Sequence, residues 1–166
     1  MSNKSTDEFE SIVLDLLNED PVKKMEYISC HGSANFLEHS INVAYMSYRI
    51  CKRFGLDYRA AAKGGMLHDL FLYDWRDGEH NGRHCFSHPQ VAYKNAMRLC
   101  SKADHIDDLT DLEKDIILKH MWPLSAKRPR YRESLVVCLA DKMCAAMESL
   151  HMKRIMRKRT AHLIAV

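Results

Sequence analysis

Apolar residues recur at helical spacing along almost the whole chain, and this pattern most restricts the fold. Between Phe9 and Leu17, for example, the apolar side chains gather on one side of a helix. A chain of 166 residues is large enough to bury a core without disulfides or structural metals. We therefore predict an all-α bundle of six or seven helices, with residues 1–150 forming a single domain.

Capping signals predict where several helices begin and end. Asp20 and Pro21 are expected as the N-cap and first residue of a second helix. Gly55 is expected to end a long helix, and Asp57 is a candidate N-cap for the next one. The expected long helices cover about residues 35–54, 58–70, 89–100, 110–121 and 130–150.

A glycine-rich segment interrupts this pattern in the middle of the chain. Residues 73–88 are predicted to form a loop, after which Ser87 and Pro89 open a helix. Thr110 and Glu113 form a capping-box pattern at the start of the following helix.

The composition is that of an ordinary globular chain, with 46% apolar and 28% charged residues. No apolar run approaches the ~20 residues needed to span a bilayer, and acids interrupt the N-terminal segment throughout. We therefore expect a cytoplasmic protein with no membrane partner. None of the six cysteines forms a C-x-x-C motif. We therefore expect reduced thiols scattered along the chain rather than three disulfides.

The positive charge is concentrated at the C-terminus. Residues 151–166 contain five basic residues and no acid, whereas residues 1–150 carry a net charge of −2. Such a tail can bind nucleic acid or an anionic surface, but it can also be the solvated end of a helix, which we prefer. Residues 1–150 offer no basic, aromatic-lined platform for nucleic acid. The sequence is also compatible with a homo-oligomer.

Six side chains suited to metal binding are spread along the chain, several of them within apolar stretches where an unpaired charge is costly. They are His39, His68, Asp69, His88, His120 and Asp141. Imidazole and carboxylate ligands together suit Mn, Fe, Co, Ni or Zn. Each residue alone has an ordinary explanation, such as a buried core histidine at position 39 or an ion pair of Asp141 with Lys142 or Arg132. Their order and spacing together favour a metal site.

In this pattern the chain resembles the HD-domain superfamily of metal-dependent phosphohydrolases, defined by H…HD…D on a helical bundle. The stretches GGMLHDLFLYDW and ESLVVCLADK carry much of the likeness, which covers most of residues 31–145. The four defining positions correspond to His39, His68, Asp69 and Asp141. His88 and His120 fall where some branches hold a second metal. The resemblance implies two divalent transition metal ions per chain, bridged by Asp69, with His68 and Asp69 at the catalytic centre.

Further residues are candidates for contacts with a small phosphorylated substrate, for which a nucleotide is our preferred class. His31 and His84 are candidate proton donors or supports of the metal ligands, and Asp74 is a candidate for positioning water or substrate. Lys142 and Arg130 are candidates for binding phosphate. A surface role for Arg130, and a helix-end role for Asp74, are alternatives.

Three functions fit these residues. The first is hydrolysis of a phosphoester or phosphoanhydride by metal-activated hydroxide. The second is a di-iron oxygenase of the same fold, because the same ligands can hold iron that activates O₂. The third is a non-catalytic, nucleotide-binding or regulatory module, which an intact ligand set disfavours. We prefer the phosphohydrolase.

Overall fold

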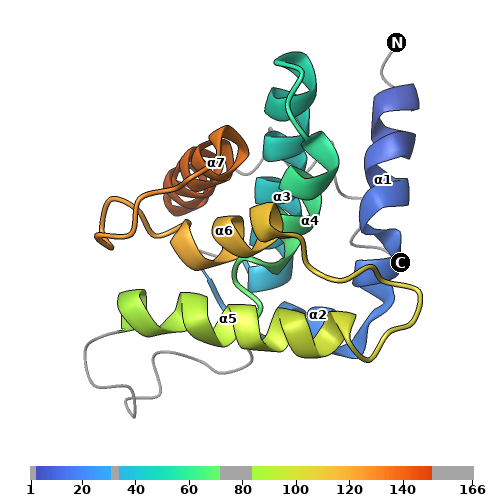
Figure 1. The fold of residues 1–166 in the computed structure, drawn as a ribbon, viewed down its shortest axis with the longest axis horizontal. Helices are drawn as coiled ribbons and strands as arrows, with labels where there is room; N and C mark the ends of the chain where they lie inside the picture. The colour runs from blue at the N-terminus through green and yellow to red at the C-terminus, as the bar shows by residue number, and fades with distance from the viewer. Residues whose placement is uncertain (1–2, 31–33, 72–83, 151–166) are drawn as a thin grey trace.

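The computed structural model describes residues 3–30, 34–71 and 84–150, and these residues form a bundle of helices (Figure 1). The α-helices are α1 (Asn3–Asn18), α2 (Asp20–Lys23), α3 (Phe36–Arg53), α4 (Tyr58–Leu67), α5 (His84–Cys100), α6 (Asp111–Lys119) and α7 (Arg132–Ser149), and a 3₁₀ helix, η1, covers Lys24–Tyr27. The described part of the chain contains no β-strand. The predicted all-α class is therefore confirmed.

Local capping explains several of these boundaries. The Asn35 side chain accepts a hydrogen bond from the backbone N–H of Glu38 at 2.8 Å and so caps the start of α3. Gly55 follows α3 with a φ of 64°, the left-handed conformation that glycine adopts most easily. Asp57 accepts from the N–H of Ala60 at 2.9 Å and caps α4, as predicted.

Two predicted helix starts are wrong by a few residues. The second helix has Glu19 rather than Asp20 at its N-cap, because the extended backbone ends one residue earlier. The helix that was expected to open at Ser87 and Pro89 begins at His84 instead, so the predicted loop extends too far. Pro89 lies in the second turn of α5, where a proline lacks one backbone N–H donor but does not end the helix.

Helix α4 occupies the centre of the bundle and packs against α1, α3, α5, α6 and α7. Two glycines in α4 allow this close approach. A Cβ atom added to Gly64 would lie 2.8 Å from the side chain of Ile116 in α6, and one added to Gly65 would lie 2.9 Å from the Cα of Ala44 in α3. Glycines on two faces of α4 therefore bring α3 and α6 each close to the backbone of α4.

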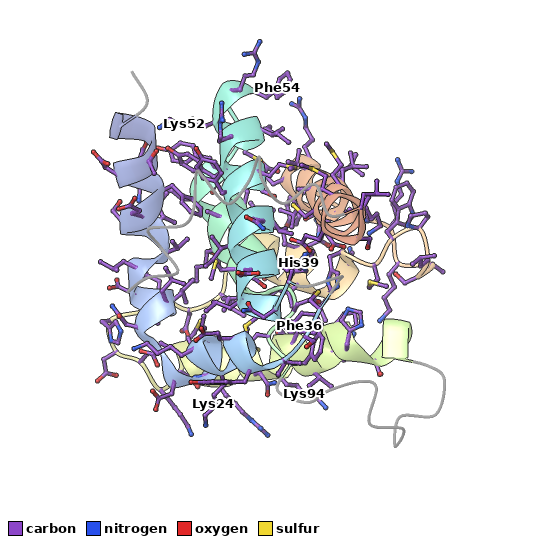
Figure 2. All side chains as sticks on the ribbon, turned by 180° about the vertical axis from the view of Figure 1, so that it is seen from behind. Lys24, Phe36, His39, Lys52, Phe54 and Lys94 are labelled. Carbon is purple, nitrogen blue, oxygen red and sulfur yellow. The ribbon has the colours of Figure 1, made fainter. Side chains whose placement is uncertain are left out.

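Buried apolar side chains hold the helices in two groups, one joining α1, α3, α4 and α5 and the other joining α3, α4, α6 and α7. Figure 2 shows Phe36 and His39 in the N-terminal part of α3, with Lys52 and Phe54 at its other end. His39 is fully buried, whereas Phe54 is exposed. The N-terminal part of α3 therefore brings a buried histidine into the interior.

The described helices include none that is long and apolar enough to cross a membrane. The five cysteines whose side chains are described are buried free thiols, as the sequence predicts. The basic segment 151–166, predicted to be a helical extension, lies outside the described residues.

Candidate metal centre

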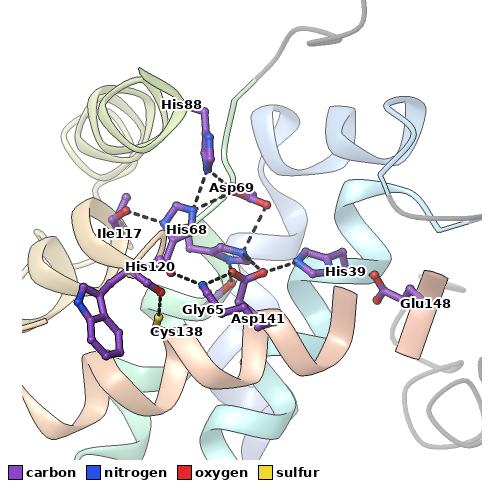
Figure 3. A network of polar contacts seen from close by, with 12 residues as sticks. His39, Gly65, His68, Asp69, His88, Ile117, His120, Cys138, Asp141 and Glu148 are labelled. Atoms are coloured by element: carbon purple, nitrogen blue, oxygen red, sulfur yellow. Dashed lines mark hydrogen bonds and ion pairs between the residues drawn. The ribbon is translucent and has the colours of Figure 1, made fainter. Parts of the chain in front are cut away.

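The six predicted metal ligands lie together in the interior, where α3, α4, α5, α6 and α7 meet (Figure 3). Each of them is buried: His39, His68, Asp69, His88, His120 and Asp141. They come from positions far apart in the chain, so only the folded bundle brings them together.

The end of α4 places the adjacent His68 and Asp69. The helix ends at Leu67, about three residues earlier than predicted, and His68 is its C-cap. The Nδ1 of His68 lies 2.7 Å from the carbonyl oxygen of Gly65 and donates to it. Neighbours inside a helix point about 100° apart. Since the chain leaves the helix here, both side chains can face the same centre.

The end of α6 places His120 in the same way. His120 is the C-cap residue, and its Nδ1 lies 2.8 Å from the carbonyl oxygen of Ile117. In both histidines the proton therefore sits on Nδ1, and Nε2 presents a lone pair to the centre. Burial lowers the pKa of His120 to about 3, the nearby Asp69 opposing this shift, so its imidazole is neutral.

One group of ligand atoms gathers around Asp141. The Nε2 of His39 lies 3.1 Å from Asp141 Oδ1, and the Nε2 of His68 lies 3.8 Å from the same oxygen. Asp69 Oδ2 joins this group at 3.4 Å from His68 Nε2.

A second group gathers around the other oxygen of Asp69. Asp69 Oδ1 lies 3.4 Å from the Nε2 of His88 and 3.5 Å from the Nε2 of His120. The two imidazole nitrogens are 2.8 Å apart. Asp69 therefore turns one carboxylate oxygen toward each group, which is the geometry of a bridging ligand.

The ligand atoms fit divalent ions in spacing and in hydrogen bonding. Atoms bound at about 2.0–2.2 Å in octahedral or tetrahedral geometry lie roughly 3.0–3.5 Å from each other, close to the separations above. His68 Nε2 and Asp69 Oδ1 are buried without a hydrogen-bond partner. Such atoms are costly to bury, and a cation on each side of Asp69 would satisfy both.

The electrostatics of the first group show how strongly it attracts positive charge. Burial by itself lowers the pKa of His39, but its hydrogen bonds to Asp141 and Glu148 overcome this and raise the pKa to about 10. Burial likewise raises the pKa of Asp141, but His39 and His68 hold it well below its usual range. With protons as the only cations, the carboxylates thus draw a proton onto His39.

Two residues that support this group were missed by the sequence analysis. Glu148, which lies beside His39 (Figure 3), accepts through Oε2 from the Nδ1 of His39 at 2.8 Å. Its Oε1 accepts from Asn42 at 3.2 Å. One available signal was spacing, because Glu148 follows Asp141 by two helical turns and shares its face of α7. An acid near a helix end looks like a surface residue unless Asp141 is already taken as a ligand.

The predicted substrate contacts are only partly described. His31 and Asp74 lie outside the described residues, and His84 is described only as the first residue of α5. Lys142 lies beside the centre, where its Nζ donates to the carbonyl of His120 at 2.7 Å and approaches Asp141 Oδ2 at 3.4 Å.

The segment between α6 and α7 is held at several points. The Arg130 guanidinium lies over the ring of Tyr131, and the backbone N–H of Arg130 donates to Asp115 at 2.8 Å. The Cys138 thiol donates to the carbonyl of Trp122 at 2.9 Å. A role for Arg130 in binding phosphate stays a prediction.

Comparison with known proteins gives the family. The HD domain model matches residues 36–146, the stretch that holds all six candidate ligands. Ribonuclease Y of Pseudothermotoga lettingae is 30% identical over 123 residues, which cover 74% of this chain and 21% of that protein. Ribonuclease Y of Thermotoga maritima is 31% identical over 141 residues, which cover 81% of this chain and 24% of that protein. No solved structure matches the chain. The match over residues 36–146 and the candidate ligands gathered within it place this chain in the HD domain family of metal-dependent phosphohydrolases.

Proposed function

We propose that this chain hydrolyses a small phosphorylated substrate, with a nucleotide as the preferred class, and that it uses two divalent transition metal ions. The observation that carries the proposal is the division of the ligands into two groups joined by the two oxygens of Asp69. Four histidines and two carboxylates suit Mn, Fe, Co, Ni or Zn better than Mg, which prefers oxygen ligands alone.

The hydrogen bonds of two histidines prepare them for metal binding. His68 and His120 keep their protons on Nδ1, so their Nε2 lone pairs need no rearrangement to bind. The ions, when bound, would lower the pKa of a water toward about 7 and neutralise charge on the phosphate. No side-chain nucleophile is required for this chemistry.

Lys142 is the residue that we propose for holding substrate phosphate. Its Nζ lies between the carbonyl of His120, in the second ligand group, and Asp141, in the first. The side chain is 34% exposed, unlike the buried ligands around it. A phosphate at the centre would therefore meet a cation that is already positioned at its edge.

A phosphodiester in RNA is the second candidate substrate, because the relatives named above are ribonucleases by name. The chain spans only 21% to 24% of the length of those two relatives, so their activity is not carried over whole. Residues 1–150 also carry net negative charge, which disfavours a long polyanion.

The test begins with elemental analysis of full-length protein purified without chelators. Metal-free protein is then reloaded with Mn²⁺, Fe²⁺, Co²⁺ or Ni²⁺ and assayed against aryl phosphate, nucleoside mono- and triphosphates and a short RNA. We expect about two metals per chain and release of phosphate or nucleotide that depends on the metal. Cleavage of the RNA alone would replace the small-substrate proposal with the second candidate. Oxygen consumption by the iron form without hydrolysis would favour the oxygenase and end the proposal.

A further inference from the structure

Glu148 is placed in an unusual environment for a carboxylate. It is 3% exposed, although it lies in the last turn of α7. Its two oxygens contact two residues of α3 that are one turn apart: Oε2 accepts from His39 Nδ1 at 2.8 Å and Oε1 accepts from Asn42 Nδ2 at 3.2 Å. Burying a carboxylate is costly unless it is paired. The pairing here fixes the ring of one metal ligand.

His39 differs in this respect from the two other histidines whose Nδ1 partners are known. His68 and His120 each donate to a carbonyl three residues earlier in their own segment. His39 instead donates to a charged carboxylate from another helix, 109 residues away. A carboxylate partner fixes the ring and raises the basicity of the opposite nitrogen more than a neutral carbonyl does. Of the three Nε2 atoms, that of His39 should therefore bind a metal ion most strongly.

The carboxylates are also distributed unequally between the two ligand groups. Asp141 and one oxygen of Asp69 lie beside His39 and His68 and would be direct ligands there, with Glu148 behind His39. The group of His88 and His120 has only the other oxygen of Asp69 among the described residues. Negative charge near a cation site increases its affinity.

We propose that Glu148 is a positioning residue for His39 and that it makes the His39–His68–Asp141 group the tighter of the two cation sites. This rests on the proposed function, since it requires that the centre binds metal. The two ions then bind in sequence: the first enters the group backed by Glu148, and the second enters the group of His88 and His120.

Cys30 raises one competing arrangement. Its thiol, a ring nitrogen of His39 and a Glu148 oxygen lie within 4.8 Å of one another, a spacing that can hold an ion of its own. However, an imidazole that binds an ion through Nε2 keeps its proton on Nδ1, where it is a donor to Glu148. The proposal therefore predicts two bound equivalents of metal rather than three.

Calorimetric titration of the metal-free, full-length protein with Mn²⁺ tests the proposal. The wild type should bind in two steps of different affinity. Glu148→Gln keeps a hydrogen-bond acceptor but removes the charge, so we expect the tighter step to weaken by about 10- to 100-fold and the weaker step to change little. Asn42→Ala, which releases only the second oxygen of Glu148, should weaken the same step by a smaller factor. It serves as the test if the Gln variant does not fold.

Glu8→Gln is the matched control, because Glu8 is also a hydrogen-bonded carboxylate that joins helices, with Tyr48, Lys52 and Tyr58 as its partners. It should leave both steps unchanged. Co²⁺ absorption spectra of the one-metal state should also differ between wild type and Glu148→Gln, which a purely structural role would not produce. A wild type that binds no metal defeats the proposed function itself. Unchanged affinity in Glu148→Gln, equal weakening of both steps, or a third equivalent overturns this inference alone.

Discussion

Asp69→Asn gives the sharpest test of the two-ion centre, because this aspartate offers a different oxygen to each ligand group. The change preserves the shape of the side chain but replaces one oxygen by an NH₂ group, which cannot bind a cation. Whichever way the amide turns, one group loses its contact with position 69. The group of His88 and His120 has no other carboxylate among the described residues, so it should be the one that fails.

The expected magnitude follows from this geometry. Metal content should fall from about two ions per chain to about one, since His39, His68 and Asp141 still surround the first position. Losing one of two ions that stabilise transition-state charge removes several kcal/mol, and about 4 kcal/mol corresponds to a roughly 1,000-fold lower kcat. The assays are elemental analysis after gel filtration and hydrolysis of the best substrate found for the wild type.

A matched control is Asp115→Asn. Asp115 is also a buried aspartate, but its contacts are with the backbone N–H of Arg130 and with Lys119. Neither is one of the six candidate metal ligands. This variant should lose stability yet retain two ions. If Asp69→Asn keeps two ions and more than about a tenth of the wild-type rate, the bridging role is refuted.

Two further predictions concern the scaffold. Gly65→Ala should lower the free energy of unfolding by about 1–3 kcal/mol, because its Cβ would lie 2.9 Å from the Cα of Ala44; thermal unfolding that stays at the wild-type temperature would contradict the close approach of α3 and α4. Hydrogen bonds from Lys52 and Tyr48 lower the pKa of Glu8 from 4.5 to about 2, so its contribution to stability is present above pH 4.5 and is lost as the pH falls toward 2. Urea unfolding at a series of pH values should therefore show a weaker pH dependence for Glu8→Gln over that window, and an unchanged profile would refute this role.

The ends of the helices could be predicted where a few neighbouring residues determine them. The capping box of Thr110 and Glu113 is formed as expected, with the Glu113 N–H donating to the Thr110 hydroxyl at 3.2 Å. Gly55 ends α3 as predicted because its left-handed conformation is a property of one residue. The start of α5 was missed because Pro89 favours a helix N-terminus but does not require one.

That the candidate ligands share one site could be predicted because the order and spacing of these histidines and aspartates within apolar stretches are informative as a set, although each residue alone is not. The groups that hold these side chains in place could not be predicted, because each is defined only by the residue it contacts in the folded protein. Glu148 meets His39 only after α3 and α7 have packed together. The carbonyls of Gly65 and Ile117 have no sequence signature at all, since every residue carries one.

The positions where α4 and α6 end therefore matter as much as the ligand residues themselves. The last carbonyls of a helix lack intrahelical partners and carry partial negative charge. Here one such carbonyl in each helix accepts the Nδ1 proton of a C-cap histidine, at Gly65 and at Ile117, and thereby turns Nε2 toward the centre. The same partial charge favours a cation beyond the helix end. Inside a longer helix, His68 and Asp69 would point about 100° apart and could reach one ion only at an edge of that helix. Because α4 ends at Leu67, this adjacent His-Asp pair lies at the end of the helix, where both side chains can reach one centre.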